Sequence, residues 1–198
     1  MANSDFYYGA YPAEYSNSLS GIFDMKMRNG NTTDFAHAVQ LGIWGFDLSS
    51  ERPINKKSGS SYLFNYRYSY SGLADKISGS DEGLNYQDLA FKINLPTKKL
   101  GTFTFWGIGL LDKIIQRPED DPKQWETSME RQEQKADFQK GAIGMAHTLS
   151  WNDNTYLRSN IGITFSGTKA ENHIYDNELN RIPVAFATKH ETNLQINT

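Results

Sequence analysis

Apolar and polar residues alternate along much of the chain. The clearest segment is Ser61–Tyr70, SYLFNYRYSY, in which every second residue is aromatic and most residues between them are polar. Successive side chains of a β-strand point to opposite faces, so this segment predicts a strand with one face of rings and one mostly polar face. The segment also raises a question: do the rings meet water, a protein core or lipid?

Further segments show the same strand-like pattern, and helix signals are scarce. A helix is indicated only in Asp121–Phe138, where Asp121 is a candidate N-cap and Pro122 a candidate first helical residue; a wholly disordered loop is the alternative. We therefore expect an all-β protein, an antiparallel up-and-down meander, with at most one short helix in the loop 121–138. The expected strands lie at about 21–28, 34–42, 46–54, 60–71, 84–95, 102–112, 141–150, 155–167 and 184–196, with a tight reversal at Gly42 and Gly45.

The connections between these strands alternate in length from residue 55 onward. The short turns NKKSG, PTKKLG and WNDN alternate with the longer segments 72–84, 113–137 and 168–183. Short turns at one end of a sheet and long loops at the other are typical of an outer-membrane β-barrel, and strands of about ten residues suit a tilted bilayer crossing.

In such a barrel wall, the apolar face of each strand points to lipid and the polar face points to the lumen. The rings of Tyr62–Tyr70 are then expected to face lipid. The same orientation is expected for Leu89, Phe91, Ile93, Leu157, Ile161 and Ile163, and the opposite one for Arg67, Asp88, Lys92, Arg158 and Asn160.

Composition sets bounds on this interpretation. The chain has 198 residues, enough for one domain with a sizeable core, and 13% of them are aromatic, which favours strands. A net charge of −3 gives no electrostatic reason to expect a nucleic-acid partner, and the absence of cysteine excludes disulfides and thiolate metal sites. No apolar run reaches the length of a membrane helix, and the first residues do not form a signal peptide.

No pattern of residues indicates catalysis. The four histidines lie at no ligand spacing, and no nucleophile elbow, phosphate-binding loop or EF-hand is present. The acidic segments EDD (119–121) and YDNE (175–178) could hold calcium, but solvated acidic loops are far more common. We expect no enzyme activity, no cofactor, and no catalytic, cofactor-binding or metal-binding residues; the ligand-binding residues are unknown.

The segment Tyr11–Asn31, YPAEYSNSLSGIFDMKMRNGN, resembles the end of the plug domain of TonB-dependent outer-membrane receptors, in particular the large receptors of Bacteroidetes-type bacteria. The resemblance is carried by Ala13-Glu14-Tyr15, by Ser20-Gly21 and by the alternating IFDMKMRNG, with Ser16 where glycine is frequent. The stretches YLFNYRYS, YQDLAFKINLPTKKLGTFTFWGIG and NDNTYLRS resemble the first barrel strands of the same receptors.

This resemblance implies a plug inside a barrel of about 22 strands. Such receptors take up scarce nutrients across the outer membrane of Gram-negative bacteria, with energy coupled through TonB. We expect residues 1–31 to be the C-terminal end of the plug and residues 32–198 to be the first seven or eight strands, roughly a third of the wall. The chain shows no TonB box, no first part of the plug and no terminal aromatic residue, so we expect it to be a fragment.

The resemblance also implies partners. The intact receptor contacts outer-membrane lipid and the TonB complex, and its ligand is a small molecule, a glycan or a peptide of unknown identity. We expect the isolated fragment to self-associate, because a severed barrel wall has two free edges. The alternative from another class is a soluble β-sandwich that binds glycans through the aromatic face Tyr62–Tyr70.

Overall fold

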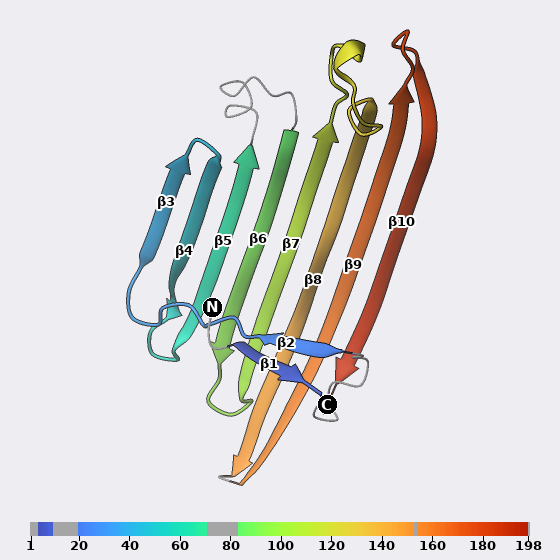
Figure 1. The fold of residues 1–198 in the computed structure, drawn as a ribbon. Coiled ribbons are helices and arrows are strands. Elements are labelled where there is room, and N and C mark those ends of the chain that lie inside the picture. Colours follow the sequence, from blue (N-terminus) through green and yellow to red (C-terminus); the bar gives the residue numbers. More distant parts are fainter. Residues whose placement is uncertain (1–3, 10–19, 71–82, 153, 198) are drawn as a thin grey trace.

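The fold is a single large antiparallel sheet with a smaller pair of strands beside it (Figure 1). The computed structural model describes residues 4–9, 20–70, 83–152 and 154–197. In the eight-stranded sheet, every strand pairs with its neighbours in the chain, in the order β3 to β10, which confirms the predicted all-β meander. Its strands are β3 (Ala36–Gly42), β4 (Gly45–Asn55), β5 (Ser60–Tyr70), β6 (Gly83–Pro96), β7 (Thr102–Gln116), β8 (Gln132–Asn152), β9 (Thr155–Tyr175) and β10 (Arg181–Asn197).

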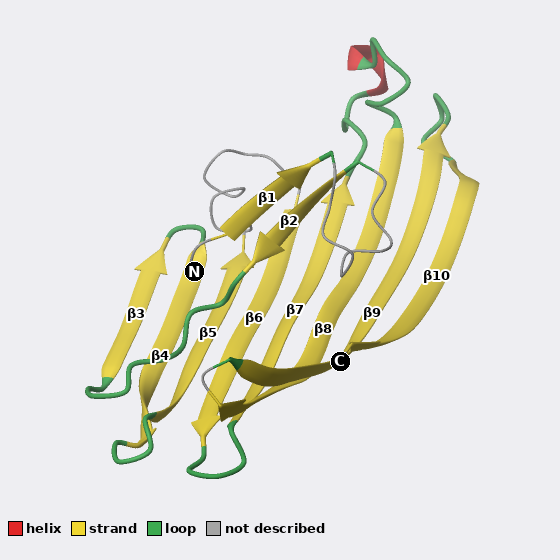
Figure 2. Ribbon diagram, turned by 90° about the horizontal axis from the view of Figure 1, so that it is seen from below, coloured by secondary structure: helices red, strands yellow, loops and turns green. Residues whose placement is uncertain are grey.

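The two remaining strands, β1 (Ser4–Tyr8) and β2 (Gly21–Met25), pair with each other and form a separate two-stranded sheet. Seen from below, this small sheet lies on one side of the eight-stranded sheet (Figure 2). Residues 26–31, which we call the strap, lead from β2 toward β3. The strand expected at 21–28 is thus confirmed in part, ending at Met25, whereas β1 was not predicted.

The connections differ from the predicted lengths. β7 continues to Gln116 and β8 already begins at Gln132, while β9 continues to Tyr175 and β10 begins at Arg181. The expected loops 113–137 and 168–183 therefore shrink to 117–131 and 176–180, because their outer parts extend the ladders of the sheet. The expected loop 72–84 lies largely outside the described residues.

The helix expected within 121–138 is wrong for most of its length. Only a single 3₁₀ turn, η1 (Pro122–Gln124), forms, and Asp121 caps it by accepting a hydrogen bond from the Lys123 amide at 3.0 Å. Residues 132–138 instead belong to β8: all of them pair with β9, and residues 134–138 also pair with β7. A strand between two neighbours satisfies its backbone hydrogen bonds on both sides, whereas the thin apolar stripe of a helix there would bury little.

No hydrophobic side chain is buried within the described part of the chain. The accessible surface is 14178 Å², whereas a compact monomer of 22.5 kDa has about 9,500 Å². The eight long strands lie in one layer, so the described residues do not form the two facing sheets of the alternative β-sandwich. A sheet of this kind lacks the apolar core that normally stabilises a soluble domain.

Candidate functional site

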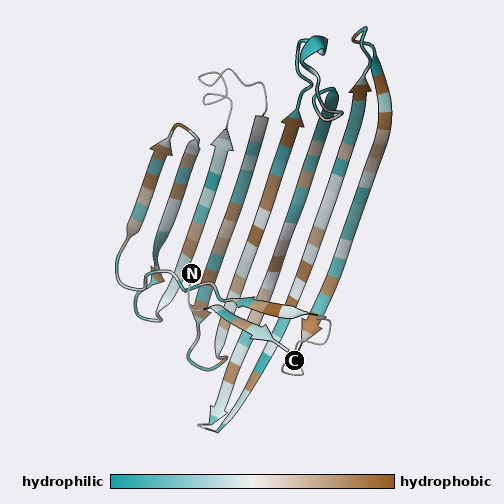
Figure 3. Cartoon of the chain, in the orientation of Figure 1, coloured by the Kyte–Doolittle hydropathy of each residue, from teal (hydrophilic) through white to brown (hydrophobic). Residues whose placement is uncertain are grey.

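The register divides the side chains of the large sheet into two chemically different faces. Residues directly opposite each other in an antiparallel pair point to the same face. Tyr62 stands opposite Ile93, Phe64 opposite Phe91, and Tyr66 opposite Leu89. The alternation that results along each strand is visible in the hydropathy colouring of Figure 3.

One face, which we call the apolar face, carries a continuous band of hydrophobic side chains across all eight strands. This apolar band consists of Val39 and Leu41 of β3, Phe46 and Leu48 of β4, Tyr62, Phe64, Tyr66 and Tyr68 of β5, Leu89, Phe91 and Ile93 of β6, Phe103 and Phe105 of β7, Ile143 and Met145 of β8, Leu157, Ile161, Ile163 and Phe165 of β9, and Leu194 and Ile196 of β10. The predicted grouping of Leu89, Phe91, Ile93, Leu157, Ile161 and Ile163 on one face is confirmed.

The band has a defined height. On β9 it runs from Leu157 to Phe165 and is followed on the same face by Lys169, Glu171 and His173. At about 3.4 Å per residue and a strand tilt of about 40°, the apolar part of β9 rises about 21 Å. Large apolar side chains in the band are open to the surroundings, with Ile161 and Ile163 each 40% exposed. Within the described residues, the band is therefore an uncovered hydrophobic surface of limited height.

Aromatic rings fill two positions in the band where the neighbouring strand has glycine. The ring of Phe91 lies over Gly107 and the ring of Phe165 lies over Gly141, so closely that an added Cβ would collide with each ring. These rings shield the bare backbone of the adjacent strand, an arrangement used to stabilise sheets.

We expect Gly107→Ala to destabilise the sheet by about 1–3 kcal/mol, because the new methyl group must displace the Phe91 ring. Gly109→Ala is the matched control, since Gly109 lies two residues along β7 and nothing lies within 4 Å of its added Cβ. Urea unfolding in detergent micelles measures both free energies. Equal effects of the two substitutions would contradict the packing of Phe91 on Gly107.

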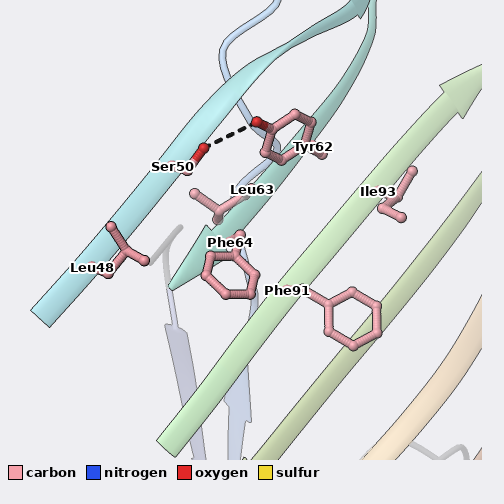
Figure 4. A pocket seen from close by; sticks show the side chains of 7 residues that line it. All are labelled: Leu48, Ser50, Tyr62, Leu63, Phe64, Phe91 and Ile93. Atoms are coloured by element: carbon pink, nitrogen blue, oxygen red, sulfur yellow. Dashed lines mark hydrogen bonds between the residues drawn. The ribbon is translucent and has the colours of Figure 1, made fainter. Parts of the chain in front are cut away.

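An open depression of about 470 Å³ lies on the sheet between β4 and β6 (Figure 4). It is lined by Leu48, Ser50, Tyr62, Leu63, Phe64, Phe91 and Ile93. A hydrogen bond of 3.0 Å joins the hydroxyl groups of Ser50 and Tyr62. With so few polar groups and an open shape, the depression suits acyl chains better than a polar ligand.

The opposite face, which we call the polar face, carries paired charged and polar side chains. Arg67 Nε donates to Asp88 Oδ2 at 2.7 Å, and Asn65 donates to Asp47 at 2.9 Å. The predicted grouping of Arg67, Asp88, Lys92, Arg158 and Asn160 on one face is confirmed by the register. β7 is an exception, because it also places Ile108 and Leu110 on this face, as its apolar sequence predicts.

The strap is attached to the polar face. The guanidinium of Arg28 forms two hydrogen bonds with the carboxylate of Glu51 on β4, one of them 2.8 Å long between Nη2 and Oε1. Glu51 also accepts a hydrogen bond from the Asn31 amide at 2.9 Å, and Lys92 on β6 donates to the Met27 carbonyl at 2.6 Å. These contacts join segments distant in the sequence, and nothing in the alternation pattern predicts them.

A charged cluster lies on the apolar face beyond the end of the band. Glu133 of β8 pairs with Lys135 at 2.8 Å and with Arg181 of β10 at 2.6 Å, and Arg181 also donates to Nδ1 of His173. Burial opposes ionisation of Glu133, but the hydrogen bond and charge of Lys135 and the charge of Arg181 outweigh it and hold the pKa of its carboxyl below its ordinary value. The apolar face therefore becomes strongly polar at this end of the strands.

The two acidic segments considered for calcium have local structural roles. Asp121 caps η1, and Asp176 accepts hydrogen bonds from the amides of Glu178 and Asn180 in the turn between β9 and β10. Among the described residues, no group of three or more acidic, histidine or cysteine side chains is placed to hold a metal ion. Nor does the described chain contain a helix that is long and apolar enough to cross a membrane.

Comparison with known proteins gives no match: no family model, no curated protein and no solved structure is significantly similar to this chain.

Proposed function

We propose that the chain is a section of a TonB-dependent outer-membrane receptor, a transporter rather than an enzyme. In this proposal the sheet β3–β10 is part of the barrel wall, and the residues before it are the end of the plug. The receptor takes up a scarce nutrient across the outer membrane with TonB-coupled energy. The resemblance of Tyr11–Asn31 to the end of a plug domain suggests this family.

The observation that carries the proposal is the apolar band on a sheet without a hydrophobic core. Its estimated height of about 21 Å is close to the apolar belt of about 25 Å around outer-membrane barrels. In this arrangement, lipid covers the band, which explains why no second layer of protein does so in the described residues. The polar face lines the interior, and the strap on that face supports the same assignment.

The proposal determines on which side of the outer membrane each connection between strands lies. Figure 1 shows the loop 117–131 at one end of the sheet and the turns at 56–59 and 97–101 at the other. Outer-membrane barrels have long extracellular loops and short periplasmic turns. In this proposal, the loop 117–131 therefore lies outside the cell.

Trypsin treatment of intact Gram-negative cells that display the receptor tests this sidedness. We expect cleavage after Lys123, which is exposed in the loop 117–131, and protection of Lys98 and Lys99, which are also exposed but lie at the opposite end. Opening the outer membrane should make Lys98 and Lys99 cleavable, while Lys123→Gln should abolish the cut at position 123 in intact cells. Cleavage at Lys98 and Lys99 alone in intact cells would invert the topology, and equal cleavage at both ends would reject the membrane proposal.

A further inference from the structure

Three neighbouring strands hold the strap, each through a different kind of contact. β4 supplies the carboxylate of Glu51, β6 supplies the ammonium group of Lys92, and β5 supplies backbone against which Gly30 is buried. A Cβ added at Gly30 would collide with the carbonyl oxygen of Tyr62, so only glycine allows the strap to lie this close to the sheet.

Glu51 is the centre of this arrangement. Both its carboxylate oxygens are used by Arg28, and Oε2 also accepts the hydrogen bond from the Asn31 amide. Its side chain is 17% exposed, while that of Arg28 is 45% exposed. A bidentate arginine–carboxylate pair fixes orientation as well as distance, and a single carboxylate here holds the strap on both sides of Gly30.

The turn after the strap is also fixed. The Asn31 side-chain oxygen accepts hydrogen bonds from the amides of Thr33 at 2.8 Å and Asp34 at 3.0 Å. On the other side of the strap, Lys26 forms ion pairs with Asp5 and Asp24 of the small sheet. The strap thus changes partner between Lys26, whose side chain pairs with the small sheet, and Met27, whose carbonyl accepts a hydrogen bond from the large sheet.

We propose that Arg28, Gly30 and Glu51 form a clamp that fixes the strap to the polar face, so that β1–β2 moves relative to the large sheet only by bending N-terminal to Arg28. The clamp residues are positioning residues, because their contacts hold the strap against the sheet. The inference rests on contacts within the chain and not on the membrane proposal.

Paired spin labels test the clamp in the full 198-residue chain. The chain has no cysteine, so cysteines introduced at Asn29 in the strap and at Lys98 in the turn between β6 and β7 can be labelled specifically. Pulsed electron paramagnetic resonance then gives the distance distribution between strap and sheet. We expect a narrow distribution for the doubly labelled parent, and one at least twice as broad after Glu51→Gln.

Asp88→Asn is the matched control, because Asp88 forms an ion pair with Arg67 on the same face without contacting the strap. We expect Asp88→Asn to leave the distance distribution narrow. The charge-swapped double variant Arg28→Glu with Glu51→Arg should give a narrower distribution than Glu51→Gln, because it restores an ion pair. Gly30→Ala keeps the charges of Arg28 and Glu51 and should also broaden the distribution. This variant therefore tests the clamp even if Glu51→Gln fails to fold. A distribution as narrow in Glu51→Gln and Gly30→Ala as in Asp88→Asn would overturn the clamp.

Discussion

Replacing Ile161 by arginine is expected to reduce the stability of the membrane-embedded protein by about 2–4 kcal/mol, the cost of an arginine on the lipid face near the bilayer midplane. Ile161 lies in the apolar band of β9, opposite Met145 and Ile196, and is 40% exposed. In the proposed receptor its surroundings are acyl chains, which cannot solvate a guanidinium group.

Asn160→Arg is the matched control for this substitution. Asn160 is the adjacent residue of β9 and points to the polar face, opposite Ala146. We expect Asn160→Arg to be tolerated, because in the proposed barrel its side chain enters the aqueous interior. The stability of both variants is measured by urea unfolding of the receptor in lipid vesicles, and their assembly by the amount recovered in the outer membrane of cells. Equal tolerance at the two positions would contradict the assignment of the faces.

The second large effect is self-association of the isolated chain in water. Without detergent, we expect the isolated chain to associate into dimers or larger species, because its described residues expose the apolar band and leave one edge each of β3 and β10 unpaired. An exposed hydrophobic patch on a soluble monomer seldom exceeds a few hundred Å², and an unpaired edge is a template for pairing with another chain. Light scattering behind a sizing column measures the mass of the species formed.

Two comparisons make this expectation specific. Detergent micelles should convert the associated chain to a monomer within a micelle, because they cover the band. Leu194→Lys places a charge in the band and should weaken association through the apolar face, whereas Asn193→Lys places the same charge on the polar face and should not. A monodisperse monomer without detergent, with little binding of a hydrophobic dye, would contradict the prediction and make a soluble domain the better interpretation.

The sequence predicts the bounds of β3 to β6 to within two residues, but those of β8 and β9 poorly. The strands expected at 60–71 and 84–95 agree with β5 and β6 to within one residue at each end, because their alternation extends to their termini. β8 was expected at 141–150 and spans Gln132–Asn152. Its first residues are polar on both faces, so no alternation of hydrophobicity marks them, and only the ladders with β7 and β9 define them as strand.

The clamp and the charged cluster were missed for a different reason. Arg28 and Glu51 lie 23 residues apart, and Glu133 and Arg181 lie on different strands, so each pair is formed only by the tertiary register. A single sequence shows that charged residues are present, but not which of them meet. The two faces, in contrast, follow from the alternation within each strand, and for this reason they were predicted correctly.

The absence of buried hydrophobic side chains in the described residues has a consequence for how this sequence can diverge. In a packed core, replacing leucine by alanine leaves a cavity and costs about 2–5 kcal/mol, so neighbouring residues must change together. In the apolar band, the space left by a smaller side chain is open. In the proposed receptor, mobile acyl chains of the lipid can refill it. Exchanges such as Ile163→Leu or Leu157→Val are then neutral one at a time, and selection preserves the alternation of polarity rather than the identity of each residue.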